Sequence, residues 1–356
     1  MTEQARRAAA ARRAMTRAGL AALLVSRPAN IRYLCGYTGS AGLLLVTRRG
    51  STFLTDFRYQ EQVKREVTAA RCVIIRTDLY SDLVALPGIR ALRRIGFESQ
   101  HLTFDRYDFL RKHLRPPVPT AGLIEGLREI KDRSEIGAIT KAAAIADRAF
   151  ARIVREIRPG MTETAIAARL EALMKEQGAS RPSFETIVGS GPNGALPHAK
   201  PGPRTVRKGD FIVLDFGAQY RGYCSDMTRT VVLGRPSDRH KLIYGIVQRA
   251  QQAGLDAVRA GVSGRAADAA ARDVIERAGH GGRFGHGLGH GVGLEVHERP
   301  RLGRLSDDVL RAGAVVTVEP GVYLPGWGGV RIEDLVVVTD AGNRVLSRSP
   351  KQLIAI

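Results

Sequence analysis

Two apolar runs in the second half of the chain share one pattern, and each leads to a carboxylate. The first, residues 209–217, begins and ends with glycine and passes through β-branched and aliphatic residues to Asp215. The second, residues 313–321, repeats this layout with Glu319 in the place of the aspartate. Apolar, β-branched runs bounded by glycine are typical of strands. The pattern therefore predicts two related strands, each with an acid close to its end.

A second acid follows each of these runs. Asp226 follows Asp215, and Glu333 follows Glu319, with glycine-containing turn signals between the two acids of each pair. The spacing predicts two hairpins that carry two acids each. Four carboxylates cost free energy to gather in a protein interior unless a cation lies between them. A pair of divalent metal ions is the natural candidate, so the sequence predicts a metal centre.

The duplication extends to the helical segments that precede these strands. Residues 145–162 and residues 246–263 share an apolar helical stretch, an arginine- and glycine-containing turn, and then Thr162 or Ser263 as the cap of an alanine-rich helix. The region 130–356 is thus predicted to hold two copies of a helix–helix–strand–hairpin unit. A pseudo-twofold axis between the copies would bring the two acidic hairpins together.

The first third of the chain has a different pattern, in which helical and strand signals alternate. Such alternation predicts an α/β domain. Prolines at 116, 117 and 119 mark a linker, so we divide the chain into domains at 1–122 and 123–356. The predicted elements, in chain order, are a helix at 4–18, strands at 20–26, 42–47 and 52–55, a helix at 58–67, a strand at 72–76, and helices at 134–156 and 162–178.

Histidines gather between the two acidic hairpins. His286 and His290 belong to residues 285–293, in which every second residue is glycine, and His297 follows shortly after. So much glycine excludes a helix interior and predicts a segment whose backbone approaches another group closely. Carboxylates combined with an imidazole suit manganese, cobalt, iron or zinc.

Composition narrows the class of protein. The 356 residues carry a formal net charge of +20, which favours acidic partners. The arginines are spread along the chain without an aromatic-rich basic motif, so nucleic acid is not predicted as a partner. No apolar stretch is long enough to cross a membrane, and no membrane partner is predicted. The three cysteines lack paired spacing, which is typical of reduced thiols in the cytoplasm.

Several strings are specific enough to indicate a family. They are residues 30–37, 54–59, 130–136, 223–230, 286–290, 296–298 and 319–321. Together they resemble the pita-bread metallopeptidases, which include aminopeptidase P, prolidase and methionine aminopeptidase. The resemblance implies an α/β N-terminal domain of the creatinase/prolidase type. An α+β pita-bread catalytic domain with internal pseudo-twofold symmetry would follow it.

The resemblance also implies a set of site residues. Five of them would be ligands of two divalent metal ions: Asp215, Asp226, His290, Glu319 and Glu333. Manganese is the preferred metal, with cobalt, zinc and iron as alternatives. The catalytic residues would be Glu319 together with four residues that match non-ligand positions of the family, namely His198, His286, His297 and Arg331.

Four of these residues have an implied role. Glu319 would take a proton from the attacking water and pass it towards the leaving nitrogen. His286 and His297 would donate hydrogen bonds to the carbonyl oxygen and the substrate backbone. His198 would shape the pocket around a proline.

The function implied by the resemblance is that of an Xaa-Pro aminopeptidase, which removes the residue before a proline in the second position of a peptide. An Xaa-Pro dipeptidase, or prolidase, is the alternative within the family. All ligand positions are filled, which argues against creatinase and against non-enzymatic relatives, although a non-catalytic protein that binds through its basic surface remains the alternative from another class. A homodimer, or a tetramer, is the assembly that the resemblance implies.

Overall fold

The computed structural model describes residues 2–356, and the chain divides into two compact units. The first unit ends at Arg128, and the second runs from Glu129 to Ile356. The predicted boundary at 122/123 lies earlier in the chain. It differs because a last short helix, α6 (Glu125–Arg128), packs against α1 (Glu3–Arg17) of the first unit.

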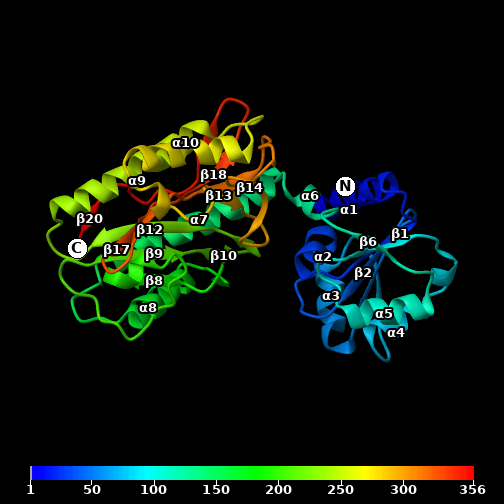
Figure 1. Ribbon diagram of the computed structural model, residues 1–356. Coiled ribbons are helices and arrows are strands. Elements are labelled where there is room, and N and C mark those ends of the chain that lie inside the picture. The colour runs from blue at the N-terminus through cyan, green and yellow to red at the C-terminus, as the bar shows by residue number, and fades with distance from the viewer. Residues whose placement is uncertain (1) are drawn as a thin grey trace. The chain divides into compact units, whose positions relative to one another are not determined.

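The first unit is built on one mixed sheet of six strands, which are β1 (Ala22–Val25), β2 (Leu43–Thr47), β3 (Ser51–Thr55), β4 (Arg71–Ile74), β5 (Ile95–Glu98) and β6 (Val118–Thr120). Their order across the sheet is β4-β3-β2-β1-β5-β6 (Figure 1). Strand β1 pairs antiparallel with β2 and parallel with β5. All four residues of β1 are buried, as expected for a strand covered on both faces.

Helices cover this sheet, namely α1, α2 (Pro28–Cys35), α3 (Gln60–Glu66), α4 (Leu79–Val84) and α5 (Phe104–His113). The helices predicted at 4–18 and 58–67 and the four predicted strands are confirmed to within a few residues. Helix α2 was not predicted. It begins with Pro28, which needs no N–H in the first turn, and ends at Gly36, whose φ of 86° is left-handed.

The second unit contains four longer helices, which are α7 (Arg133–Ile153), α8 (Glu163–Glu176), α9 (Asp238–Ala257) and α10 (Gly264–Arg277). A four-stranded sheet has the order β20-β12-β9-β8, with β8 (Ile187–Ser190), β9 (Phe211–Phe216), β12 (Met227–Val232) and β20 (Ile354–Ala355). A five-stranded sheet has the order β14-β13-β15-β18-β19, with β13 (Gly289–Gly291), β14 (Glu298–Leu302), β15 (Val315–Val318), β18 (Asp334–Val338) and β19 (Asn343–Val345). None of the helices between residues 2 and 356 has the length and apolar character that a membrane crossing requires.

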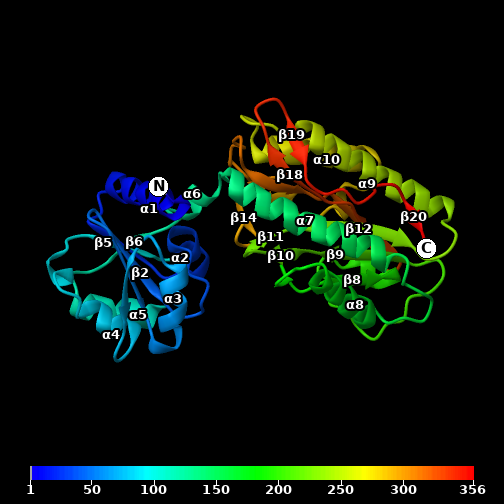
Figure 2. The same cartoon turned by 180° about the vertical axis from the view of Figure 1, so that it is seen from behind.

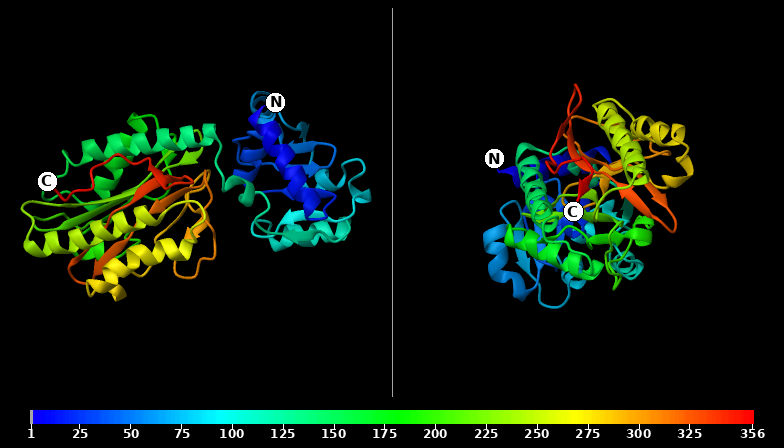
Figure 3. Two further views of the ribbon diagram at one scale, coloured as in Figure 1. Left: turned by 90° about the horizontal axis from the view of Figure 1, so that it is seen from above. Right: turned by 90° about the vertical axis from the view of Figure 1, so that its left-hand side faces the viewer.

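Short strands complete this unit: β7 (Arg181–Pro182), β10 (Ala218–Tyr220), β11 (Tyr223–Cys224), β16 (Gly321–Leu324) and β17 (Gly328–Arg331). Figure 2 shows α7 crossing in front of the strands, where it contacts β10 and β11. The left view of Figure 3 shows α7 on one side of the strands, with α9 and α10 on the other. The strands of the unit therefore lie in a layer between helices.

The predicted duplication is confirmed by the order of these elements. The series α7-α8-β8-β9-β12 is followed by the series α9-α10-β13-β15-β18, with the same antiparallel pairings in each copy. Both caps form matching isolated bridges, Thr162 with Thr205 and Ser263 with Val309. The two copies bury separate apolar clusters, one under α7 and α8 and the other under α9 and α10.

The two copies meet where β12 runs beside residues 331–333, at the end of β17. The Glu333 N–H donates to the Thr228 carbonyl oxygen at 3.1 Å, and the Arg331 N–H donates to Thr230 Oγ1 at 3.1 Å. These contacts place the acid-bearing segments of both hairpins at one junction inside the unit.

We predict that the two symmetry-related caps contribute similarly to stability. Thr162 Oγ1 accepts the Ala165 N–H at 3.1 Å, and Ser263 Oγ accepts the Ala266 N–H at 3.2 Å. Thr162→Ala and Ser263→Ala should each lower the free energy of unfolding of this unit by about 1 kcal/mol, since an N–H at each helix start loses its partner. Urea unfolding followed through the single tryptophan, Trp327, measures the effect. Thr162→Ser and Ser263→Thr should stay close to the unsubstituted protein, and a loss as large as that of the alanine variants would contradict the capping role.

Candidate metal centre and substrate pocket

Three buried carboxylates from different strand ends converge at the junction of the two copies. Asp215 lies in β9, Asp226 lies between β11 and β12, and Glu333 lies between β17 and β18. One oxygen of each lies within 4.8 Å of an oxygen of the other two. The acids predicted to share a site are therefore brought together.

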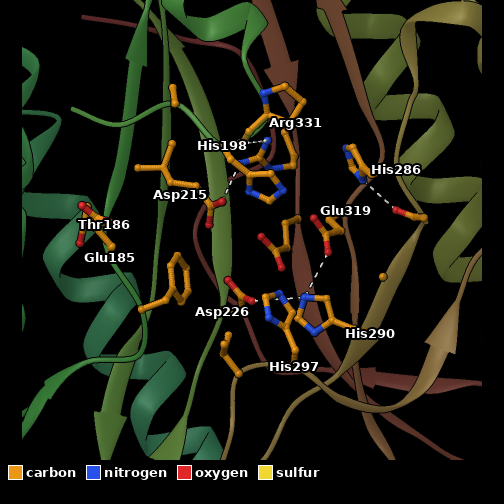
Figure 4. Close-up of a pocket in the computed structure, with 18 of the residues that line it drawn as sticks. Glu185, Thr186, His198, Asp215, Asp226, His286, His290, His297, Glu319 and Arg331 are labelled. Carbon is orange, nitrogen blue, oxygen red and sulfur yellow. Dashed lines mark hydrogen bonds and ion pairs between the residues drawn. The ribbon is translucent and has the colours of Figure 1, made fainter. Parts of the chain in front are cut away.

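The remaining two predicted ligands approach the same point from the second sheet. His290 lies in β13 and Glu319 directly follows β15. His290 Nε2 is 3.3 Å from Glu319 Oε1 and 3.6 Å from Asp226 Oδ2. Figure 4 shows Asp215 and Asp226 on one side of the centre with Glu319 and His290 facing them. All five groups thus surround one small volume.

The hydrogen bonds around this volume leave some atoms pointing inward without a partner. His290 Nδ1 donates to the Gly291 carbonyl oxygen at 3.1 Å, so Nε2 is the ring nitrogen that faces the centre. Thr228 Oγ1 donates to Glu333 Oε2 at 2.7 Å, and Arg331 Nη2 donates to Asp215 Oδ2 at 2.5 Å.

The second oxygens of these two carboxylates, Asp215 Oδ1 and Glu333 Oε1, are buried and have no hydrogen-bond partner among the described residues. Buried polar atoms without a partner are rare and point to a missing ligand or ion. An oxygen-rich donor set with one imidazole fits hard or borderline divalent cations.

The acids are held in unequal charge environments. Burial raises the pKa of Asp226 and of Glu333 well above their usual values, and the neighbouring carboxylates push them further in the same direction. Burial also acts on Glu319, but the hydrogen bond and charge of His290 outweigh it and lower its pKa to about 2. The positive charge of the surrounding protein therefore does not balance the four acids when they are ionised. A cation at their centre would stabilise all of the carboxylates as anions.

The glycines of residues 285–293 allow β13 to approach its neighbours closely. A Cβ on Gly289 would lie 2.1 Å from the Thr317 carbonyl oxygen, and one on Gly291 would lie 2.2 Å from that of Arg299. By contrast, a Cβ on Gly285 would meet no atom within 4 Å. The close approach predicted from the sequence is thus found in the strand that carries His290, and not at Gly285.

A pocket of about 440 Å³ opens onto the acids. Its lining includes all five predicted ligands and the four other predicted site residues, His198, His286, His297 and Arg331. The rings of His290 and His297 meet edge to face at 4.2 Å. Apolar and charged neighbours complete the wall, among them Phe184, Glu185, Ile187, Pro197, Lys200 and Val296.

The segment that carries His297 is anchored from the first residues of this unit. Lys131 Nζ lies 3.1 Å from Glu298 Oε2, and both side chains are almost fully buried. Glu298 Oε1 also accepts the Glu295 N–H at 3.1 Å, which closes the turn before His297. The ion pair therefore holds one side of the pocket.

Two residues of the site were not predicted. Thr228 joins Glu333 to Arg331, whose Nε donates to Thr228 Oγ1 at 3.0 Å. Tyr323 lies on β16 with its hydroxyl 2.7 Å from Arg331 Nη1. Thr228 belongs to residues 223–230, one of the strings that resemble the family, and follows Asp226 by two residues. Tyr323 stands two residues after Gly321, which ends another such string. These positions close to predicted ligands are the signal that could have indicated both residues.

The sequence matches two known domain types. Residues 137–340 match metallopeptidase family M24, and residues 7–130 match the creatinase/prolidase N-terminal domain. The chain therefore belongs to metallopeptidase family M24, with a creatinase/prolidase N-terminal domain before its catalytic part. The predicted fold class and enzyme class are confirmed.

Relatives and solved structures cover almost the whole chain. An uncharacterized peptidase from Bacillus subtilis is 44% identical over 345 residues, which is 95% of this chain and 96% of the relative. The Xaa-Pro dipeptidase from Pyrococcus horikoshii is 38% identical, with 96% of each chain covered. Among solved structures, an Xaa-Pro dipeptidase from Bacillus anthracis has a TM-score of 0.96 at 43% identity, covering 99% of this chain and 100% of the other. An X-Pro aminopeptidase from Thermotoga maritima has a TM-score of 0.90 at 37% identity, covering 97% and 100%.

We predict that Asp226→Asn lowers metal content and peptidase activity together. The amide cannot supply an anionic oxygen to the centre, so activity should fall on the order of 100-fold or more. The metal-free protein should not be destabilised, because the substitution removes one of several repelling buried carboxylates. Elemental analysis and thermal unfolding with and without added metal measure both effects. Asp273→Asn, on the exposed face of α10, is the matched control, and full metal content in Asp226→Asn would contradict the assignment.

We also predict opposite outcomes for two glycines of the same segment. Gly289→Ala should destabilise the protein by about 1–3 kcal/mol, since its new methyl group must displace the Thr317 backbone. Gly285→Ala should change stability little, because the added methyl group meets open space. Chemical unfolding of the two variants tests the difference, and equal stabilities would show that β13 can move away from β15.

Proposed function

We propose that this protein is a metal-dependent peptidase that hydrolyses the bond between an N-terminal residue and a following proline. The observation that carries the proposal is the convergence of three buried carboxylates, the partly buried Glu319 and one imidazole at the base of a pocket. Two of those carboxylates keep a buried oxygen without a partner. The named relatives that act on Xaa-Pro peptides support the same substrate class.

Asp215, Asp226, His290, Glu319 and Glu333 would hold two divalent ions, with manganese preferred and cobalt, zinc or iron as alternatives. When bound, such ions make a water molecule nucleophilic near neutral pH and polarise the scissile carbonyl. One oxygen of Asp226 lies within 4.8 Å of an oxygen of Asp215 and of Glu333, and its Oδ2 lies 3.6 Å from His290 Nε2, so Asp226 adjoins ligands from both sheets. The five side chains are positioned before any substrate arrives, because strands and glycine contacts hold them.

Glu319 is the residue suited to move a proton. It lies beside His290 at the base of the pocket, with Oε1 3.3 Å from His290 Nε2. As a carboxylate it can accept a proton from the attacking water and release it to the leaving nitrogen. His297 can orient the substrate by donating a hydrogen bond, because burial lowers its pKa and keeps its ring neutral with one N–H.

A proline in the second position suits the lining of this pocket. The bond before proline has no N–H, so the pocket needs no acceptor for it, while the ring needs an apolar surface. Ile187, Pro197 and Val296 supply apolar surface near the histidines. His198 lies beside Pro197 and would shape this surface.

Within this substrate class we favour an aminopeptidase. A dipeptidase must bind a free carboxylate, and a dedicated cation in the pocket would serve that purpose. Arg331 cannot serve it freely, because its guanidinium already donates to Asp215, Tyr323 and Thr228. Of the residues lining the pocket, the other permanent cation is Lys200, which is exposed.

The dipeptidase is the second candidate, and Lys200 is the observation that favours it. Its ammonium group could reach the carboxylate of a dipeptide at the pocket mouth. The names of the relatives from Pyrococcus horikoshii and Bacillus anthracis also support this candidate.

We further propose that the protein acts in the cytoplasm, which its three free cysteines support. A homodimer remains the predicted assembly. Light scattering of the purified chain would measure its oligomeric state.

We predict that the manganese-loaded protein hydrolyses both Ala-Pro and Ala-Pro-Ala-Ala. The kcat/KM for the longer peptide should be no more than about tenfold below that for the dipeptide. The same peptide with alanine in place of proline should be a poor substrate. Mass spectrometry of the released residues measures all three. Cleavage of the dipeptide alone would establish the dipeptidase, and cleavage of neither proline peptide by metal-loaded protein would contradict the proposed function.

Lys200 distinguishes the two candidates further. In a dipeptidase, Lys200→Gln should raise KM for Ala-Pro, because the substrate carboxylate loses its cation. In an aminopeptidase it should leave KM for Ala-Pro-Ala-Ala close to that of Lys208→Gln. Lys208 is the matched control, since it is exposed and does not line the pocket.

A further inference from the structure

The Tyr323 hydroxyl lies between two residues of the site. It is 2.7 Å from Arg331 Nη1 and 2.8 Å from His286 Nε2. Tyr323 is 6% exposed, and burial raises its pKa to about 12, so the hydroxyl keeps its proton at neutral pH. The hydroxyl therefore has one proton to donate and lone pairs to accept with.

The direction of each hydrogen bond follows from the chemistry of the partners. A guanidinium can only donate, so Arg331 donates to the Tyr323 oxygen. A carbonyl oxygen can only accept, so His286 Nδ1, 2.8 Å from the Gly287 oxygen, carries a hydrogen. Burial lowers the pKa of His286, so its ring is neutral and Nε2 has no hydrogen. Nε2 then accepts a hydrogen bond from the Tyr323 hydroxyl.

The sequence around Tyr323 makes room for this arrangement. A Cβ on Gly321 would lie 2.6 Å from the Tyr323 hydroxyl oxygen, and a Cβ on Gly329 would lie 2.9 Å from its ring. Gly321 pairs with Arg331 across the β16–β17 hairpin, and Gly329 pairs with Tyr323. The two glycines therefore leave one face of the hairpin to the tyrosine and the arginine.

We propose that Tyr323 is a positioning residue of the active site, which holds Arg331 against Asp215 and fixes His286 as the tautomer with hydrogen on Nδ1. Both ring nitrogens of His286 are then used within the protein. His286 has no N–H to offer a substrate, in contrast to the role that the family resemblance implies for it. Hydrogen bonds to the substrate carbonyl must come from other groups in the pocket, such as His297. The effect on catalysis rests on the proposed function, whereas the tautomer and the hold on Asp215 do not.

Nitrogen-15 NMR of histidine-labelled protein tests the tautomer without any substrate. In the metal-free and zinc-loaded protein, His286 should show a protonated Nδ1 and an unprotonated, hydrogen-bonded Nε2. In Tyr323→Phe the Nε2 signal should move towards that of a free acceptor nitrogen. Tyr244→Phe is the matched control, because Tyr244 is also buried and its hydroxyl donates to the Lys351 carbonyl oxygen away from the pocket.

Calorimetric titration with zinc and steady-state kinetics test the positioning. Tyr323→Phe should weaken zinc binding about 10-fold and lower kcat about 10-fold, with a smaller change in KM. This is expected for a residue that orients Arg331, the hydrogen-bond partner of the predicted metal ligand Asp215. Tyr244→Phe should keep both values. If Tyr323→Phe fails to fold, the NMR experiment on the unsubstituted protein still decides the tautomer.

A protonated Nε2 on His286 in the unsubstituted protein would overturn the tautomer assignment. Zinc affinity and kcat in Tyr323→Phe equal to those of the control would overturn the positioning role. A failure of the proposed function would look different, because Xaa-Pro peptides would then remain uncut by the unsubstituted protein while its NMR signals and zinc affinity stayed as expected.

Discussion

The structure depends on the cost of gathering four carboxylates around one point, three of them buried and the fourth, Glu319, partly buried. Asp215, Asp226, Glu319 and Glu333 all lie inside the second unit, yet the nearest permanent cation, Arg331, satisfies one oxygen of Asp215 and no other of their oxygens. Such an arrangement is unfavourable for a protein that stays without ligands. The family to which the chain belongs resolves this, because metal ions supply the missing positive charge. Much of the local architecture can be understood as holding the acids in place until that charge is present.

The internal duplication explains how the chain meets this requirement. Each copy supplies a strand that ends with an acid, and the contacts of Thr228 and Thr230 with the segment 331–333 join the copies at that place. Two related helix pairs then cover the strands. A site formed between two copies obtains ligands from both sheets, so neither copy has to bury more than two of the acids by itself.

The acids and the copies that carry them could be predicted from the sequence, because both depend on local patterns. The glycine-bounded runs identify β9 and β15, and the caps identify α8 and α10. Tyr323 could not be predicted in the same way, since its hydrogen bonds join residues from three separate segments. Helix α2 was not predicted because its short apolar stretch lacks a clear period. The glycines of residues 285–293 were predicted to allow close approach, but only the three-dimensional packing separates Gly289 from Gly285.

The buried ion pair between Lys131 and Glu298 has a practical consequence for shortening the chain. Lys131 stands three residues beyond the end of the first unit at Arg128, yet it anchors the turn that carries His297. A catalytic fragment that started after residue 131 would keep every residue of the pocket and lose the cation that holds one of its walls. Such a fragment should therefore begin before Lys131, which itself precedes the first helix of the catalytic part.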